Sequence, residues 1–362
     1  MAGPSWQPTS SAPRGPRNDA RGRGSLRRRR GGRAVTLLAA TCALVLVGAW
    51  GVRTVLDRQD STAPVVEACR ATYRGTSWEL SPERSSFAAL VAVRALARGM
   101  PARAATIAIA TAYQESTILN LDHGDRDSFG LFQQRPSQGW GTKAEVRDPV
   151  HATESFYTAL AKVPGYRDMS VTDAAQAVQR SGFPEAYADH EDLGRAWASA
   201  LHGYSAANLT CTLAPVVLDE DGSFDDGLAK ADRGSAPAAP LTVFERRVAR
   251  DLPELGTTLR TQGSQASDPD STGAVALPTV RIDAVEAAQV LGQGTGAPTA
   301  DRTAWALGQW AVAVAAQTGA QSVDVTTREG TLRWSRGTEG WHPVSSGAEA
   351  GVTVTFPAGP SS

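Results

Sequence analysis

Few histidines and cysteines, and no familiar cofactor motif, limit the chemistry available to this chain of 362 residues. The five histidines show no ligand spacing with a cysteine or with one another, so a zinc site is not expected. The sequence also lacks a phosphate-binding glycine loop and the Gly-x-Ser-x-Gly turn of a serine nucleophile. We therefore expect no metal and no other cofactor.

Acidic residues are almost absent from residues 1–33, although the whole chain has a net charge of only −1. This segment holds nine arginines and one acid, Asp19, and its charge of +8 leaves −9 for the remainder. It is also rich in Gly, Pro and Ser, a composition typical of a disordered arm. A membrane span after the arm, with the arginines on its cytoplasmic side, explains this charge, so no nucleic-acid partner is expected.

One long apolar run follows the arm, at residues 34–52, and its 19 residues carry no charge. A helix of this length spans the hydrocarbon core of a bilayer, which is about 30 Å thick. The arginines before it predict a single-pass anchor with a cytoplasmic N-terminus, and residues 53–67 read as an extracytoplasmic stalk. A cleaved signal peptide, with a site at Ala49-Trp50-Gly51, is the alternative. A single span excludes a self-contained transporter.

Only three cysteines are present, and one of them, Cys42, lies within the apolar run. Cys69 and Cys211 remain as the only pair in the exported part, where an oxidising compartment permits a disulfide. Closing a loop of this length stabilises the fold by about 4–5 kcal/mol in the chain-entropy model. The alternative is two unpaired buried thiols.

Residues 68–213 have the pattern of a nearly all-helical domain. Ser81-Pro82 is a typical helix start, with a serine N-cap and proline at the first helical position. Pro101 opens a second helix, which ends near Ser116. Residues 117–148, rich in Gly, Asp, Ser and Pro, form a long loop of the kind that is often functional. Further helices are expected at 149–163, 171–181 and 192–204.

The rest of the chain is expected to form a linker and a small module. Residues 214–272 are linker-like in composition and contain a charged helix at 242–260. Residues 273–358 predict an α+β module with a helix at 303–318 and strands at 322–327, 331–335 and 351–356. This module could recruit a partner of the cell envelope. The whole chain is thus expected to be mainly α.

The strongest chemical signal is Glu115-Ser116, followed by Gly130-Leu131-Phe132-Gln133. Glu115 ends a mostly apolar helix, where desolvation and the negative end of the helix dipole both favour the protonated carboxyl. A protonated glutamic acid beside a cleft can deliver a proton to a glycosidic oxygen. A solvated glutamate at a helix end is the alternative interpretation.

This combination resembles the signature of lytic transglycosylases and goose-type lysozymes. The stretch from Gly124 to Gly141 resembles membrane-anchored actinobacterial proteins with a lysozyme-like domain, and the resemblance extends over roughly residues 68–213. It implies a lysozyme-like α domain that cleaves the β-1,4 bond between N-acetylmuramic acid and N-acetylglucosamine in peptidoglycan. Glu115 matches the catalytic acid.

A second carboxylate would decide the reaction. Asp122, Asp125 and Asp127 are candidates, and by resemblance Asp125 matches an acid of goose-type lysozymes, whereas Asp122 and Asp127 could equally structure the loop. A further family acid falls here on Arg135, which disfavours inverting hydrolysis. A transglycosylase needs only Glu115, first as acid and then as base toward the sugar's own 6-hydroxyl. We therefore expect a lytic transglycosylase, with a muramidase assisted by Asp125 and a non-catalytic wall-binding or scaffold protein as alternatives.

Six residues are expected to bind or position the substrate. Gln133 and Gln134 are polar groups, and Trp140 is an aromatic group, on the loop. Ser116 either contacts the substrate itself or orients the loop or Glu115. Phe132 could stack on sugar or belong to the core. In the family a Tyr-Asn pair on a later helix lines the cleft; this sequence departs from that pattern, and Gln179 and Tyr187 are the nearest counterparts.

Overall fold

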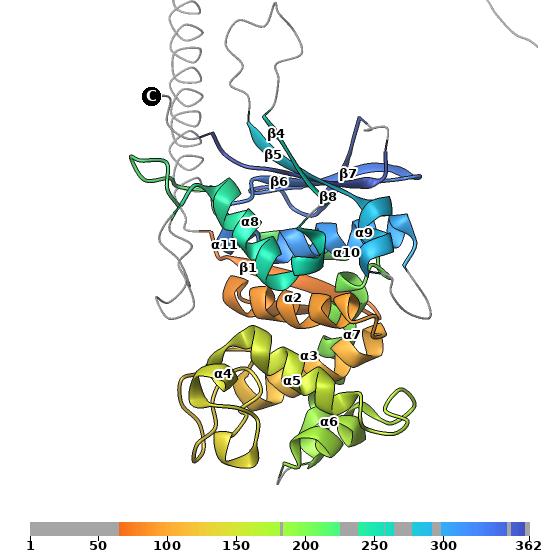
Figure 1. Cartoon of the computed structure of the whole chain (residues 1–362). Helices are drawn as coiled ribbons and strands as arrows, with labels where there is room; N and C mark the ends of the chain where they lie inside the picture. Colours follow the sequence, from red (N-terminus) through yellow and green to blue (C-terminus); the bar gives the residue numbers. More distant parts are fainter. Residues whose placement is uncertain are drawn as a thin grey trace, which may run out of the picture. The chain divides into compact units, whose positions relative to one another are not determined.

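The computed structural model describes residues 65–181, 184–224, 238–256, 258–263, 277–291, 298–345 and 349–358. All of them belong to one compact unit. This unit mixes α and β structure and contains two antiparallel sheets, so the expectation of a mainly α chain is not confirmed (Figure 1). The arm 1–33, the apolar run 34–52 and most of the stalk lie outside the described residues. Within the described part, none of the helices has both the length and the apolar character that a bilayer span requires.

Two long helices form the centre of the N-terminal half. Helix α2 (Pro82–Ala97) begins as expected, with the Ser81 side chain accepting a hydrogen bond from the backbone N–H of Arg84. Helix α3 (Ala102–Ser116) is buried over most of its length. Both are rich in alanine, which allows close packing on several sides at once.

Shorter helices surround these two. They are η1 (Pro136–Gln138), α4 (Lys143–Arg147), α5 (Pro149–Leu160), α6 (Val171–Gln179), η2 (Pro184–His190) and α7 (Glu191–Leu201). Helices α5, α6 and α7 all contact α3. Helices α4, α5 and α6 lie on the side of α3 away from the C-terminal half (Figure 1).

A small sheet in this half was not expected. Strands β1 (Ala68–Tyr73), β2 (Thr76–Leu80) and β3 (Leu209–Thr212) pair in the order β2-β1-β3. Apolar and polar residues do not alternate strictly in β1 and β2, and β3 has only four residues, so the sequence gives no clear strand pattern here. The strands join the two ends of residues 68–213, which are far apart in sequence.

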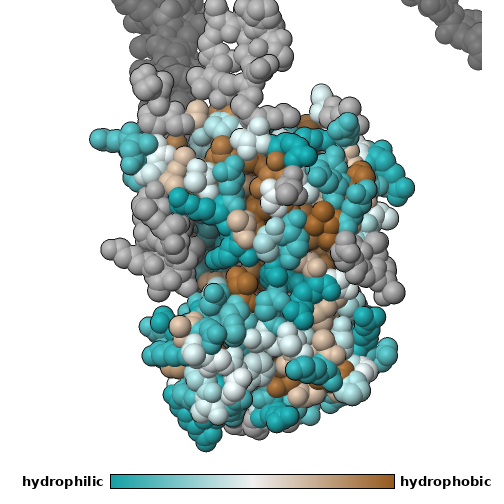
Figure 2. Space-filling model, viewed as in Figure 1, coloured by the Kyte–Doolittle hydropathy of each residue, from teal (hydrophilic) through white to brown (hydrophobic). Residues whose placement is uncertain are grey.

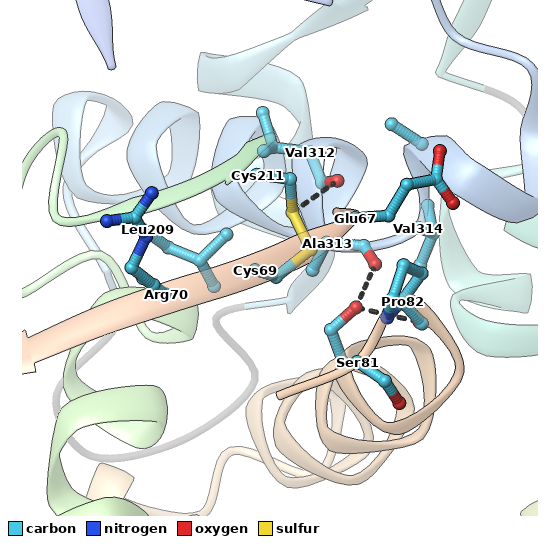
Figure 3. The surroundings of a disulfide bond; sticks show 12 residues. Glu67, Cys69, Arg70, Ser81, Pro82, Leu209, Cys211, Val312, Ala313 and Val314 are labelled. Carbon is cyan, nitrogen blue, oxygen red and sulfur yellow. Dashed lines mark hydrogen bonds between the residues drawn. A yellow bond between two sulfur atoms is a disulfide. The ribbon is translucent and has the colours of Figure 1, made fainter. Parts of the chain in front are cut away.

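The predicted disulfide between Cys69 and Cys211 is present. The two residues face each other across the β1–β3 pair, and both are buried. Figure 3 shows them beneath the C-terminal part of the chain, where the Cys211 Sγ lies 3.4 Å from the carbonyl oxygen of Val312. The alternative of two unpaired thiols is therefore wrong.

The C-terminal half is a six-stranded antiparallel sheet with helices packed on one face (Figure 1). Its strands are β4 (Leu259–Gly263), β5 (Pro278–Asp283), β6 (Ser322–Thr327), β7 (Gly330–Ser335), β8 (Trp341–Val344) and β9 (Gly351–Thr355), in the order β4-β5-β9-β6-β7-β8. Its helices are α8 (Pro240–Asp251), η3 (Pro253–Leu255), α9 (Ala284–Leu291), α10 (Ala300–Ala313) and α11 (Ala315–Thr318). The strands predicted at 322–327, 331–335 and 351–356 are confirmed to within a residue.

The segment expected as a linker is partly built into this half. Its charged helix ends at Asp251 rather than at residue 260, and residues 259–263 form β4. Phe244 and Val248 of α8 are fully buried. The Arg247 guanidinium donates to the Ser86 hydroxyl and carbonyl of α2 at 3.0 and 2.8 Å. Helix α8 thus packs against the N-terminal half instead of acting as a spacer.

Gln309 of α10 joins the two halves through four hydrogen bonds in the interior. Its side-chain amide donates to the carbonyl oxygens of Ala200 and Ser205, at 2.8 and 3.0 Å. Its oxygen accepts from the backbone N–H groups of Asn208 and Leu209, at 2.9 and 2.7 Å. The contact surface between the halves is therefore a buried interface and not a hinge.

Tryptophans of the C-terminal half also lie at this interface. Trp310 and Trp334 are fully buried. The indole N–H groups of Trp334 and Trp341 donate to the carbonyl oxygens of Cys211 and Leu209 in β3, both at 2.9 Å. On the face shown in Figure 2, hydrophilic residues cover most of the half that contains α3 to α6, and hydrophobic residues gather nearer the C-terminal half.

Candidate active site

Glu115 lies in the last turn of α3, where a buried helix reaches the surface. The residues one to two turns before it, Ile107 to Ala112, are fully buried, whereas Glu115 itself is only partly exposed. Thr117 ends the helix in the left-handed conformation, with φ at 54°. Ile118 follows with φ at 57° and is buried, so the chain turns sharply away. The carboxyl therefore stands at the rim of the core, as the sequence predicted.

The pKa of the Glu115 carboxyl is raised above its usual value, chiefly because burial disfavours the charged form. Hydrogen bonds from Tyr187 and Gln179 oppose this shift and lower the pKa. The Tyr187 hydroxyl donates to the Glu115 Oε1 at 2.7 Å. Burial, and then the adjacent carboxyl, raise the pKa of Tyr187, so its hydroxyl remains a donor. The Glu115 carboxyl is thus fixed by Tyr187, and it retains its proton to higher pH than an exposed glutamate does.

The turn at residues 130–133 is attached to the end of α3 by Ser116. The Ser116 hydroxyl lies 2.8 Å from the carbonyl oxygen of Leu131 and accepts from the Leu119 N–H at 3.2 Å. Gly130 has φ at +77°, and a Cβ there would lie 2.3 Å from the Val146 carbonyl oxygen, so only glycine fits. Phe132 is buried and stacks on Phe156 at 4.6 Å between ring centroids, a core role.

A cleft of about 480 Å³ opens beside Glu115. It is lined by Glu115, Asp125, Arg126, Ser128, Gln133, Arg135, Gln138, Trp140, Gln179, Arg180 and Ser181. A second cavity of about 1040 Å³ shares Gln138, Trp140, Gln179 and Arg180 with it. The two spaces therefore adjoin along these four residues.

The cleft brings together Glu115, Asp125, Gln133, Trp140 and Gln179, five of the eight residues expected in the catalytic and binding site. Gln133 also supports the loop, since its amide accepts from the Ser128 hydroxyl at 2.9 Å and donates to the His123 carbonyl oxygen at 3.3 Å. The Gln179 amide donates to the Phe132 carbonyl oxygen at 2.8 Å.

Three expected site residues do not line the cleft. Tyr187 is buried and reaches Glu115 from within the protein. Ser116 is buried and supports the loop, which fits its orienting role rather than substrate binding. Gln134 is a correction: it is 1% exposed, and its amide donates to the Ala152 carbonyl oxygen at 3.0 Å. The bridge between Phe129 and Gln134 turns that side chain into the core.

The loop aspartates have distinct environments. Asp125 lines the cleft, and its side chain is 93% exposed and 3.8 Å from the Arg126 guanidinium. The Ser137 N–H and Arg135 lower the pKa of Asp127 to about 2, and this carboxylate holds the start of η1. Asp122 is exposed and pairs with His123 at 2.9 Å. Loop structuring therefore accounts for Asp127, and Asp125 is the aspartate that faces the cleft.

Three arginines at the cleft, Arg126, Arg135 and Arg180, were not predicted as site residues. The Arg135 guanidinium bonds Asp127 at 2.8 Å. Arg126 and Arg180 both have positive φ, 58° and 54°. The sequence gives no sign of these turns, because neither position carries the Gly or Asn that usually marks them.

Within the described part of the chain, no group of three or more His, Cys, Asp or Glu side chains is arranged to hold a metal ion. Comparison of the sequence with protein-family models and with curated proteins finds no match. Functional inference therefore depends on the chemistry of the cleft and on the resemblance carried by its motifs.

Proposed function

We propose that this protein cleaves the β-1,4 bond between N-acetylmuramic acid and N-acetylglucosamine in peptidoglycan, as a lytic transglycosylase. The observation that carries the proposal is the raised pKa of Glu115, a half-buried carboxyl held by Tyr187 at the edge of a polar cleft. A glycosidic oxygen leaves poorly unless it is protonated, and a carboxylic acid with a raised pKa supplies that proton near neutral pH.

The proposed reaction uses Glu115 twice. The protonated carboxyl gives its proton to the glycosidic oxygen, and the bond between that oxygen and C1 of the muramic acid breaks. The resulting carboxylate then removes the proton from the 6-hydroxyl of the same muramic acid. As the proton leaves, the 6-oxygen forms a bond to C1. The products are a 1,6-anhydro sugar and a free 4-hydroxyl, and the enzyme regains its proton without consuming water.

A muramidase is the second candidate, because Asp125 also lines the cleft. In an inverting hydrolase a second carboxylate lies roughly 6.5–9.5 Å from the carboxylic acid and activates a water molecule. Two observations favour the transglycosylase. Asp125 is almost fully exposed, and Arg135 occupies the position of the other family acid and binds Asp127. A non-catalytic wall-binding protein would have no need of a protonated acid in the cleft.

The resemblance also suggests the wider context. We propose that residues 68–213 form a lysozyme-like unit, that the apolar run 34–52 anchors the chain in the cell membrane, and that the rest lies outside the cytoplasm. The disulfide is consistent with an oxidising compartment. The C-terminal half could contact another protein of the cell envelope.

Digestion of purified peptidoglycan by the full-length chain in mild detergent, followed by mass spectrometry, tests the function. We expect anhydro-muropeptides from the wild type, and at least about a thousandfold fewer from Glu115→Gln, since the amide cannot donate that proton. Asp125→Asn should change the rate by less than about tenfold, because the transglycosylase needs one carboxyl.

Other products would change the conclusion. Reducing-end products that disappear in both variants would identify a muramidase. Absence of cleavage, together with intact binding to the wall, would favour the binding protein.

A further inference from the structure

A serine hydroxyl at the edge of the cleft is bonded to the phenol that holds Glu115. Tyr187 is completely buried, and its hydroxyl donates its one hydrogen to the Glu115 Oε1 at 2.7 Å. The Ser181 side chain forms a hydrogen bond with the same phenol. Because Tyr187 has no second hydrogen to give, Ser181 is the donor in this bond. The three side chains therefore form one hydrogen-bonded chain, from Ser181 through Tyr187 to Glu115.

The two ends of this chain line the cleft, whereas its middle lies inside the protein. Ser181 and Glu115 are both cleft residues, and Tyr187 is enclosed between them. The mechanism proposed above uses Glu115 and Tyr187 but gives Ser181 no part. Ser181 is nevertheless the group at the cleft surface that bonds the Tyr187 hydroxyl.

The end of α6 holds Ser181 in place. The Gln176 amide donates to the Ser181 carbonyl oxygen at 2.8 Å and accepts from its N–H at 3.1 Å. Because both backbone groups are bonded, little further entropy is lost when the hydroxyl bonds Tyr187. Gln179, two residues earlier, bonds Glu115 itself. The end of α6 thus supplies two groups to the acid, one directly and one through the phenol.

A hydroxyl that accepts a hydrogen bond becomes a stronger donor, because bonds in a chain polarise one another. Burial, and then the adjacent Glu115 carboxyl, raise the pKa of Tyr187, whereas the bond from Ser181 lowers it. The more acidic phenol donates more strongly to the Glu115 carboxylate and so favours the charged form. Without Ser181, the phenol oxygen would have a lone pair to accept the hydrogen of protonated Glu115, which would favour the uncharged form instead.

Other charged groups surround this chain of side chains. His190 follows on η2, and burial lowers the pKa of its imidazole, so the ring is neutral at neutral pH. These groups keep their places when the Ser181 hydroxyl is removed, so they do not enter a comparison between the wild type and a variant at this position. The charged residues that line the cleft with Glu115 are Asp125, Arg126, Arg135 and Arg180.

We propose that Ser181 is a positioning residue for the acid, which acts through the Tyr187 hydroxyl and directs its hydrogen to Glu115. The effect on the reaction rests on the proposed function, whereas the effect on the Glu115 carboxyl does not. Ser181 favours the carboxylate, which is the form that receives the proton of the 6-hydroxyl in the second stage of the proposed reaction.

The test follows the ionisation of Glu115 by carbon-13 NMR, in the full-length chain in mild detergent with labelled glutamate carboxyls. The Glu115 signal is the one that is missing from Glu115→Gln. In Ser181→Ala the midpoint of its titration should lie about 0.3–0.7 of a pH unit higher, which is a two- to fivefold change in the ionisation constant. Ser181→Thr keeps the hydroxyl and should restore the midpoint of the wild type.

A double variant shows whether Ser181 acts through Tyr187. In the Tyr187→Phe background, Ser181→Ala should leave the midpoint unchanged, because the hydroxyl that links the two residues is gone. Ser322→Ala is the matched control, since this half-buried serine of β6 lines neither cavity, and it should titrate as the wild type does. An unshifted midpoint in Ser181→Ala, or an equal shift with and without the Tyr187 hydroxyl, would overturn the inference.

Digestion of purified peptidoglycan by the same variants separates this inference from the proposed function. The alkaline limb of the pH profile of kcat in Ser181→Ala should move with the NMR midpoint. If the midpoint shifts as expected but the wild type releases no anhydro-muropeptides, the function fails and the assignment of Ser181 stands. Cleavage by the wild type, together with an unshifted midpoint in Ser181→Ala, has the opposite meaning.

Discussion

At Glu115, two hydrogen-bond donors oppose the burial that raises the carboxyl pKa. In the proposed reaction this residue alternates between acid and base, and the balance of burial and hydrogen bonds suits both states. Full desolvation would make the carboxylate hard to form, whereas a solvent-exposed carboxyl would lose its proton too early. Tyr187 stabilises the charged form and fixes the carboxyl orientation, so it tunes both stages of the proposed reaction.

Replacing Tyr187 by phenylalanine removes the donor to the carboxylate while keeping the ring. Because this donor favours the charged form, its loss should raise the pKa of Glu115 further. The alkaline limb of the pH profile of kcat should therefore move to higher pH, and kcat at neutral pH should fall by about ten- to a hundredfold because the base is misoriented. Initial rates of anhydro-muropeptide formation across pH measure this.

Tyr113→Phe is the matched control for this change. Tyr113 is also half-buried near the end of α3, where it packs against His190 at 4.7 Å between ring centroids, but it is not bonded to Glu115. Its profile should coincide with that of the wild type. An unshifted alkaline limb in Tyr187→Phe would remove Tyr187 from the tuning of the acid.

Sequence reasoning located Glu115 because an apolar helix ending in a carboxylate is a local signal. It placed Gln134 wrongly because a glutamine beside a motif looks the same whether it faces a cleft or the core. The bridge between Phe129 and Gln134, which the local pattern does not reveal, decides the direction. Arg180 was missed because its position depends on the end of α6 meeting the loop after α3.

The long helices and the strands β6, β7 and β9 are readable in the sequence because their periodicities extend over five or more residues. Strands β1 and β2 are not, because apolar and polar residues do not alternate strictly in them, and β3 has only four residues and pairs with β1 across residues 68–213. The same holds for β4, whose residues look like linker until they pair with β5. Pairing partners, rather than local propensity, determine these strands.

The position of α3 depends on a close crossing with α7 at Gly194. A Cβ on Gly194 would lie 2.6 Å from the Thr106 carbonyl oxygen, which is backbone and cannot rotate away. Gly194→Ala should therefore force the helices apart and lower the free energy of unfolding by about 1–3 kcal/mol. Because α3 carries Glu115, kcat should fall as well. Thermal unfolding and the cleavage assay measure the two effects.

Gly256→Ala provides the comparison for this helix crossing. Its backbone has ordinary dihedral angles, with φ at −53°, and the nearest atom to an added Cβ is 3.5 Å away. This variant should unfold within about 0.5 kcal/mol of the wild type. Equal stabilities for Gly194→Ala and Gly256→Ala would show that the α3–α7 crossing can relax.

At the scale of the whole described unit, the C-terminal half is part of the fold that supports Glu115. Helix α10 contacts α2, α7 and β3, and α8 supplies a buried ion pair between Arg247 and Asp251 at 2.6 Å. Arg247 and Arg250 lower the pKa of Asp251 against the effect of its complete burial. Removing this half would expose apolar helices and leave buried polar groups without partners. The composition of the segment between the halves gave no indication of this, because a linker and a packed surface helix can share the same polar residues.

Because the two halves share a buried interface, we expect them to unfold together. Gln309→Leu keeps a similar volume but removes the side-chain partner of the Ser205 carbonyl oxygen and of the Asn208 and Leu209 N–H groups, and each loss costs about 1–3 kcal/mol. We therefore expect the free energy of unfolding to fall by at least about 3 kcal/mol, with equal loss of stability in α3 and in β6. Hydrogen exchange of the full-length chain, read by mass spectrometry, should show the same loss of protection in peptides from both elements.

Gln289→Leu, on the exposed face of α9, should change neither. Loss of protection confined to the C-terminal peptides would mean that the halves are independent domains, and that the cleft at Glu115 folds without the sheet.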